Sequence, residues 1–332
     1  MSRLGVASQT WAMLTGRFSV QMLLAAVVAA FLTTFALVRL DVFPSYPRDT
    51  YNNYRTADLV NIKDVPPQSM ARSVGPEDVV VPFDSLMKGP LTIDQDDPRL
   101  IQRIKTQYIY PPSDLPYMLA NKAKDDPSMG QSRKIREILG EKTDGFFIEC
   151  GALDGETRSN TLVFEKRYGW KGVLIEGDPK NFNLMKEKHR KAWSVNACLS
   201  THPYPNTVMF KQSFNIGKIS SLETGHEHRG FAEVQCLPLY SLLLALNTTK
   251  VDYFSLDVEG AELDVLRTIP WEKVDITTLS VEFIHDKEGK DAIKWYMEGN
   301  GYKVYSEVTH PGSLANDFIF VKKDFQINNV QS

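Results

Sequence analysis

Residues 146–157 read FFIECGALDGET, a mostly apolar strand followed by a turn that contains two glycines. Gly151 and Gly155 allow the tight backbone turn that leads from a buried strand into a helix. Twenty-one residues after Gly155, a second apolar segment ends at Glu176. This order of strand, turn, helix and strand is typical of an α/β domain with a parallel sheet.

The same alternation continues towards the end of the chain. We expect helices at 132–139, 157–168, 179–190, 238–246, 261–268 and 290–299, and strands at 146–150, 172–176, 193–199, 208–212, 251–257, 278–283, 302–308 and 317–322. The predicted fold class is α/β, a doubly wound, mostly parallel, Rossmann-like sheet with helices on both faces. The last two strands have no helix between them, so they should form an antiparallel pair at one edge.

The N-terminal part of the chain has a different character. Residues 18–38 contain no charged side chain, and as a helix they would measure about 31 Å, close to the ~30 Å hydrocarbon core of a bilayer. The alternative is a cleaved secretory signal, whose apolar core would be shorter. Twelve of the 18 prolines lie between residues 40 and 127, which favours an extended stem. The predicted organisation is a cytosolic tail (1–17), a transmembrane helix (18–38), a proline-rich stem (39–130), a folded domain (131–325) and a tail (326–332).

Charge and glycosylation patterns bear on partners and orientation. The chain has 38 Lys and Arg against 41 Asp and Glu, and a net charge of -3 gives no basic surface for nucleic acid. The partners we expect are therefore a membrane and no nucleic acid. Asn247-Thr248-Thr249 is the single N-glycosylation pattern, and its use would place the C-terminal domain in the lumen.

Carboxylates follow several of the expected strands, where a doubly wound sheet binds its ligand. They are Glu149, Asp154, Glu156, Glu176, Asp178, Asp257 and Glu259. Glu176 is placed to accept the hydroxyls of an adenosine ribose, and the glycine turn lacks the pattern of a dinucleotide site. Because the acids repel phosphate and favour a cation, S-adenosylmethionine is the cofactor that fits best. Each acid taken alone could instead be a solvated loop residue or a helix cap.

The sequence leaves the catalytic residues open. Methyl transfer to a hydroxyl usually needs a general base, and Asp257, Glu259 and His285 are the candidates. Asp286 could orient His285, or the histidine could simply be a surface residue, and Glu282 is expected to lie within the sheet. His226-Glu227-His228 lacks a second spaced pair of ligands, so we expect no metal site.

The chain contains three cysteines. Cys198 and Cys236 each end an expected strand and could form a disulfide in an oxidising lumen. Cys150 adjoins the glycine turn and is expected to be a packed thiol.

Four segments resemble the FkbM-type methyltransferase domain: FIECGA at 147–152, VLIE at 173–176, YFSLDVEGAE at 253–262 and NDFIFV at 316–321. The resemblance covers about residues 145–323, and DVEGAE is its most specific segment. It implies a class I methyltransferase fold that uses S-adenosylmethionine, with Glu149, Gly151, Gly155 and Glu176 as cofactor contacts and Asp257 facing the pocket. Together with the acids named above, the cofactor-binding candidates are Glu149, Gly151, Asp154, Gly155, Glu176, Asp178 and Asp257. Glu259 would also face the pocket.

Within this family the sequence is most similar to the Star proteins, through residues 148–160, 169–172 and 238–247. Star proteins are single-pass membrane proteins that carry this domain in the lumen and assist the export of membrane-bound precursors of epidermal growth factor receptor ligands. The resemblance implies a type II protein of the endoplasmic reticulum, Golgi or late endosome with growth-factor precursors as partners. The alternative is an active O-methyltransferase acting on a lumenal or membrane-linked hydroxyl.

Overall fold

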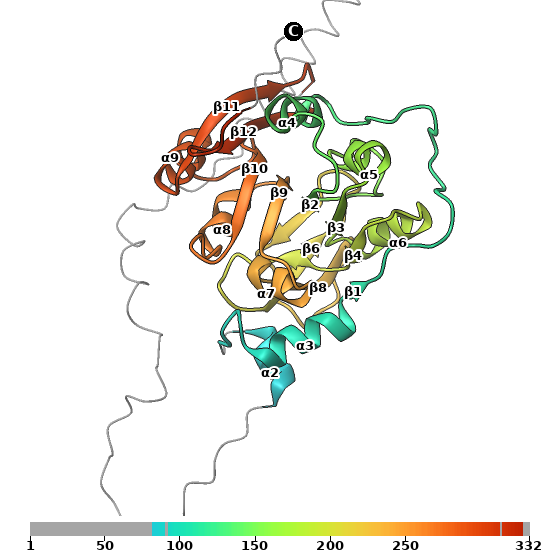
Figure 1. Ribbon diagram of the computed structural model, residues 1–332. Helices are drawn as coiled ribbons and strands as arrows, with labels where there is room; N and C mark the ends of the chain where they lie inside the picture. The colour runs from blue at the N-terminus through green and yellow to red at the C-terminus, as the bar shows by residue number, and fades with distance from the viewer. Residues whose placement is uncertain (1–81, 90–91, 313, 328–332) are drawn as a thin grey trace, which may run out of the picture. The chain divides into compact units, whose positions relative to one another are not determined.

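The computed structural model describes residues 82–89, 92–312 and 314–327, all within one folded unit (Figure 1). The expected cytosolic tail, the expected transmembrane helix at 18–38 and the first half of the expected stem lie outside these residues. Among the helices in the described ranges, none is both long enough and apolar enough to cross a membrane.

The main sheet has eight strands in the order β1-β4-β3-β2-β9-β10-β12-β11. They are β1 (Ile109–Tyr110), β2 (Phe146–Cys150), β3 (Lys171–Ile175), β4 (Trp193–Val195), β9 (Lys250–Leu256), β10 (Asp275–Glu282), β11 (Tyr302–Thr309) and β12 (Asn316–Lys322). The five strands from β4 to β10 run parallel to one another, whereas β1 pairs antiparallel with β4. β12 lies between β10 and β11 and runs antiparallel to both. The mostly parallel sheet and the antiparallel pair at its edge are therefore confirmed.

Helices cover both faces of this sheet (Figure 1). The helices are α2 (Phe83–Lys88), α3 (Pro98–Gln107), α4 (Gln131–Leu139), α5 (Leu162–Tyr168), α6 (Pro179–Glu187), α7 (Leu239–Ala245), α8 (Glu262–Arg267) and α9 (Lys290–Gly299). Alternate residues of a strand face opposite sides: Phe147 packs with α4, α5 and α6, whereas Ile148 packs with α3, α7, α8 and α9. Because both faces are covered, β2, β3, β9 and β10 are buried along nearly their whole length rather than alternating between buried and exposed residues.

The folded domain includes elements from the segment that the proline content marked as a stem. Leu100 and Ile104 of α3 are fully buried in the core that contains Ile148. The start of α3 carries a local signal, because the Asp97 side chain accepts a hydrogen bond from the Arg99 amide and Pro98 is the first helical residue. Counting prolines over the whole segment obscured this signal.

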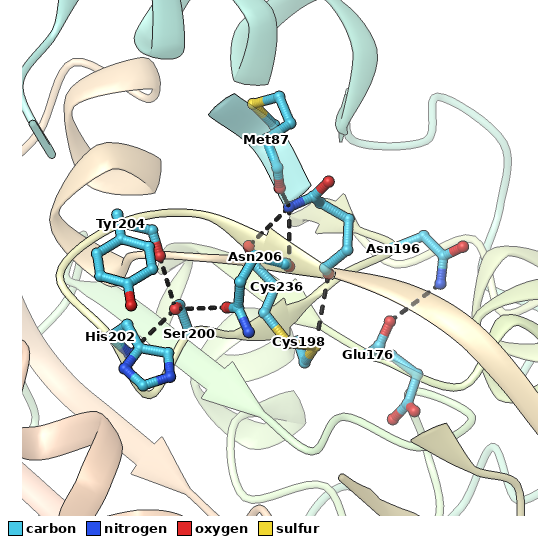
Figure 2. Close-up of a disulfide and its surroundings, with 10 residues drawn as sticks. Met87, Glu176, Asn196, Cys198, Ser200, His202, Tyr204, Asn206 and Cys236 are labelled. Carbon is cyan, nitrogen blue, oxygen red and sulfur yellow. Dashed lines mark hydrogen bonds between the residues drawn. A yellow bond between two sulfur atoms is a disulfide. The ribbon is translucent and has the colours of Figure 1, made fainter. Parts of the chain in front are cut away.

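A smaller sheet has the strand order β5-β8-β6-β7. Its strands are β5 (Cys198–Leu199), β6 (Asn206–Lys211), β7 (Lys218–Ser220) and β8 (Phe231–Leu237). The expected strand at 193–199 is thus divided between two sheets, and the sequence analysis missed β7 and β8. At the division, the Asn196 side chain donates a 3.1 Å hydrogen bond to the backbone carbonyl of Glu176 (Figure 2).

A disulfide joins the neighbouring strands β5 and β8 (Figure 2). It links Cys198 and Cys236, whose Cα atoms are 4.3 Å apart, and Cys150 is a buried free thiol. The disulfide that the sequence left open is thus present, and the expectation of a packed Cys150 thiol is confirmed. Cys236 is fully buried, so the bond lies inside the smaller sheet rather than on its surface.

Replacing Cys236 with serine should lower the free energy of unfolding by about 4 kcal/mol, because the bond joins residues 38 positions apart and restricts the unfolded chain. Unfolding of protein produced under oxidising conditions, with and without a reductant, measures this. Reductant should destabilise the wild type, slow its migration on a gel and leave the Cys236→Ser variant unchanged. A wild type that reductant does not affect would contradict the bond.

Candidate functional site

A cavity of about 350 Å³ lies beyond the carboxyl ends of β3, β2, β9 and β10. Strands β2 and β9 are neighbours in the sheet although about a hundred residues separate them in the chain, so the strand order reverses between them. The volume is within the range of small-molecule sites. The cavity is therefore where the topology of a doubly wound sheet places a ligand.

Gly151 brings the ends of β2 and β9 together. Its φ is +81°, and a Cβ atom at this position would lie 2.0 Å from the backbone oxygen of Asp257. The Asp257 amide in turn donates a 3.2 Å hydrogen bond to the carbonyl of Cys150. Gly151 and Asp257 both line the cavity, so this contact forms part of its floor. Gly155 has a different role, because it packs against Met185 and does not line the cavity.

Glu149 lines the cavity, but its carboxylate mainly orders the loop that follows β2. It accepts hydrogen bonds from the Ser159 hydroxyl at 2.8 Å, the Asn160 amide at 2.6 Å and the Thr161 hydroxyl at 2.5 Å. Burial raises the pKa of Glu149, and the nearby Arg190 opposes that shift. A direct cofactor contact by Glu149 would compete with these three bonds.

Glu176 follows β3 and lines the cavity with its side chain 95 % buried by the surrounding residues. Its two oxygens accept one backbone hydrogen bond each, from Leu153 and from Asp178, both at 2.7 Å. A carboxylate has about four lone-pair sites, so two acceptor positions remain for ligand hydroxyls. Burial raises the pKa of Glu176 to about 7, against the lowering effect of the two amides.

The wall next to Glu176 is apolar and comes from the smaller sheet. A Cβ atom on Gly177 would lie 3.1 Å from the ring of Phe210, and Phe214 and Ile216 line the same cavity. The Asn181 side chain donates a 2.7 Å hydrogen bond to the carbonyl of Phe214, and this bond holds the loop between β6 and β7 in place. The sequence analysis did not find this wall, because it treated residues 200–237 as a loose region with one strand.

Two more candidate cofactor residues, in addition to Gly155, do not line the cavity. Asp154 accepts hydrogen bonds from the amides of Glu156 and Thr157, and Asp178 caps the first turn of α6 by accepting from the Lys180 amide. For these two acids the alternative interpretation, a loop acid or a helix cap, describes the structure.

The candidate catalytic residues meet at the other end of the cavity. His285 Nδ1 lies 2.8 Å from Glu282 Oε1 and 3.1 Å from Glu259 Oε2. Asp257, Glu259, Glu282 and His285 all line the cavity. Asp286 does not orient the histidine; it accepts hydrogen bonds from the amides of Leu263 and Glu288 instead.

Few positively charged groups lie close to these acids. Burial and neighbouring carboxylates raise the pKa of Asp257 to about 6, of Glu259 to about 7 and of Glu282 to about 10. Asp257 is exposed to the cavity yet surrounded by protein on its other sides, which explains its raised pKa. Within the described ranges, Arg158 is the one Lys or Arg residue that lines the cavity, and it partly lowers the pKa of Asp257.

A separate carboxylate organises the loop after β9. Glu262, at the start of α8, accepts hydrogen bonds from the amides of Val258 at 2.8 Å and of Gly260 at 3.0 Å. The sequence left open whether Asp257 and Glu259 are loop-ordering residues or ligand contacts, and in the structure Glu262 orders this loop. Asp257 is consequently available to a ligand, whereas Glu259 already contacts His285.

Comparisons with known proteins agree with this arrangement at the level of the family domain. Residues 149–304 match the family model described as the methyltransferase FkbM domain. Residues 149–304, slightly less than half of the chain, are therefore similar to an FkbM methyltransferase domain, and they lie on a mostly parallel α/β fold. No protein of curated function matches the chain significantly.

Solved structures of methyltransferases are similar to part of the chain. Methyltransferase FkbM from Methylobacillus flagellatus is 15 % identical with a TM-score of 0.37, and the match covers 53 % of this chain and 43 % of that one. For a TehB-like methyltransferase from Corynebacterium glutamicum the identity is 12 %, the TM-score 0.32, and the coverage 58 % and 88 %. For M. capricolum TrmK in complex with S-adenosylhomocysteine the values are 7 %, 0.33, 60 % and 71 %. This chain thus matches less than half the length of the Methylobacillus protein.

The family domain supports S-adenosylmethionine as the candidate cofactor, and the cavity residues fit it. Glu176 keeps two acceptor positions beside an apolar wall, as a ribose and an adenine require. The acids at the opposite end suit a positively charged group. The cavity therefore has an apolar end beside Glu176 and an acidic end at Asp257, Glu259 and Glu282.

The raised pKa of Glu176 predicts an unusual dependence of stability on pH. Between its unfolded value of 4.5 and its folded value of about 7, the folded protein retains a proton that the unfolded chain has released. The free energy of unfolding should therefore fall as the pH rises through this window. Asp317, whose pKa is also raised to about 7, acts in the same direction. The pKa of His285 is lowered, so the contribution of this one residue to the free energy of unfolding changes with pH in the opposite direction.

Melting of the full-length protein between pH 5 and pH 8 measures this effect. The melting temperature should decrease by several degrees towards pH 8, with a shallower slope for Glu176→Gln and an unchanged slope for the exposed control Glu187→Gln. A melting temperature that rises over this range would contradict the assignment.

Proposed function

We propose that the domain binds S-adenosylmethionine in the cavity and transfers its methyl group to a hydroxyl acceptor. The observation that carries the proposal is the position of Glu176, which faces the cavity beside the apolar wall with acceptor positions to spare. The family match to a methyltransferase domain supports the same reading.

Each end of the cavity would bind a different part of the cofactor. Glu176 would accept the ribose hydroxyls, and Phe210 and Ile216 would pack against the adenine. Glu176 and Asp257 follow strands that are two positions apart in the sheet, a separation of roughly 10 Å. That separation allows one ligand to reach both ends. The bound cofactor supplies an activated methyl group on a sulfonium ion.

Asp257 is the residue with the properties of a general base. It lines the cavity and is exposed to it, and its raised pKa of about 6 leaves it mostly ionised at neutral pH while still able to accept a proton. Glu259 and His285 are less free, because Glu259 Oε2 lies 3.1 Å from His285 Nδ1 and the same nitrogen lies 2.8 Å from Glu282 Oε1. In this scheme the protein positions the acceptor, and Asp257 takes its proton.

S-adenosylhomocysteine or S-adenosylmethionine should raise the melting temperature of the full-length protein, because either compound binds only the folded state. Glu176→Ala should abolish the shift by removing the acceptor of the ribose hydroxyls. The matched control is Glu187→Ala, an exposed glutamate of α6 that does not line the cavity. No shift of the wild type at millimolar ligand would overturn the proposal, as would an unchanged shift in Glu176→Ala.

A second candidate function is that of a Star-like membrane-anchored protein, which binds growth-factor precursors in the lumen and assists their export. The disulfide between Cys198 and Cys236 supports it, because disulfides persist in oxidising compartments. Asn247 is exposed just after α7, as a glycosylated residue must be. Segment 18–38 would be the anchor of this type II protein in the endoplasmic reticulum, Golgi or late endosome.

Co-precipitation from cells that express the full-length protein tests this second function. Membrane-bound precursors of epidermal growth factor receptor ligands should co-precipitate with it and should remain in the endoplasmic reticulum when it is depleted. A glycosidase-sensitive mobility shift that Asn247→Gln abolishes verifies that the domain entered the lumen. If the glycosylated protein binds no precursor and its depletion leaves export unchanged, the trafficking role is excluded.

A further inference from the structure

At the acidic end of the cavity, carboxylates and one histidine form two groups of side chains whose oxygen and nitrogen atoms are closely spaced. One group is Glu259, Glu282 and His285, and the other is Asp257, Glu262 and Glu282; within each group the atoms lie within 4.8 Å of one another. In the second group, Glu262 already accepts the backbone amides of its loop. Among the described residues, the side chains of the first group make no such bonds to the backbone, and their close polar contacts are with one another.

Glu282 shows an unmet need for a partner. It is 7 % exposed and lies at the end of β10, and its Oε2 atom is buried with no hydrogen-bond partner among the described residues. Its other oxygen contacts His285 Nδ1. A buried polar atom without a partner is rare in folded proteins and calls for an ion, a water or a ligand. Glu282 also lines the cavity, so an ion bound at this end of the cavity would lie beside it.

The backbone holds Glu259 and His285 in contact. Glu259 has a φ of +59°, which is unusual for a residue with a side chain. The following Gly260 has a φ of +106°, and a Cβ atom there would lie 2.7 Å from the backbone oxygen of His285. The loops after β9 and β10 therefore touch at Gly260. This contact brings two carboxylates and one imidazole to the same point.

We propose that Glu259, Glu282 and His285 bind a divalent metal ion. Carboxylate oxygens and an imidazole nitrogen are the donors that manganese, iron and zinc accept, and Mn²⁺ suits a site with more oxygen than nitrogen. The ion would supply the missing partner of Glu282 Oε2. It would also offset the negative charge of Asp257, Glu259 and Glu282. Among the described residues, no Lys or Arg nitrogen forms an ion pair with these three carboxylates.

The site would lie at the end of the cavity remote from Glu176. Glu176 and Glu282 follow strands β3 and β10, which are three positions apart in the sheet, or roughly 14 Å. Three protein ligands leave coordination positions open towards the cavity. If the proposed methyl transfer is correct, the acceptor hydroxyl could occupy one of them; binding of the ion itself does not depend on that reaction.

The test is a titration of full-length, tag-free protein with Mn²⁺ after treatment with a chelator. Electron paramagnetic resonance reports the free ion. The wild type should bind one equivalent. Glu282→Gln should weaken binding by about tenfold or more, since even outer-shell changes reach that range. His285→Ala is the second variant, chosen because its side chain is 45 % exposed and its loss should leave the fold intact.

The control is Glu288→Gln, an exposed acid three residues after His285 that pairs with Arg267. Its Mn²⁺ affinity should equal that of the wild type. Glu176→Ala should also retain Mn²⁺ binding, which separates this proposal from the cofactor site at the other end of the cavity. Failure of the wild type to bind one equivalent would overturn the proposal, as would unchanged affinity in both Glu282→Gln and His285→Ala.

Discussion

The contact between Gly151 and the backbone oxygen of Asp257 is the constraint on which the site depends. It joins the ends of β2 and β9, which are adjacent in the sheet and where the order of the strands reverses. No side chain fits there, because a Cβ atom would approach the oxygen to 2.0 Å. With the two strand ends fixed, Glu176 and Asp257 face one cavity from either side of the contact. The close spacing also concentrates carboxylates in a poorly solvated space, and this raises their pKa values.

Much of the fold could be predicted from local sequence patterns. The apolar strands and the helices between them specify a parallel sheet, because each pattern encodes its own periodicity and the connections are short. The position of β12 between β10 and β11 was not predictable in the same way, since it depends on which strand pairs with which. Residues 98–110 were misread because an average over prolines concealed a well-capped helix. The smaller sheet was missed because its strands are short and separated by long loops.

The site was predictable only in part, for a related reason. Glu176 could be found because its position at the cavity follows from its spacing after the glycine turn within one continuous segment. The contact of His285 with Glu282 and Glu259 could not, because it depends on how two loops from neighbouring strands meet. Asp178 illustrates the opposite error, since an acid that follows a strand also precedes a helix and can serve as its cap. Sequence position alone does not distinguish these roles; the direction of the side chain does.

The central claim is that the cavity binds an adenosyl compound with Glu176 at the ribose. The most direct measurement is a crystal structure of the protein with S-adenosylhomocysteine. The account predicts that both ribose hydroxyls lie within hydrogen-bond distance of Glu176, with the adenine against Phe210. A ligand bound elsewhere, or a ribose that does not contact Glu176, would contradict it.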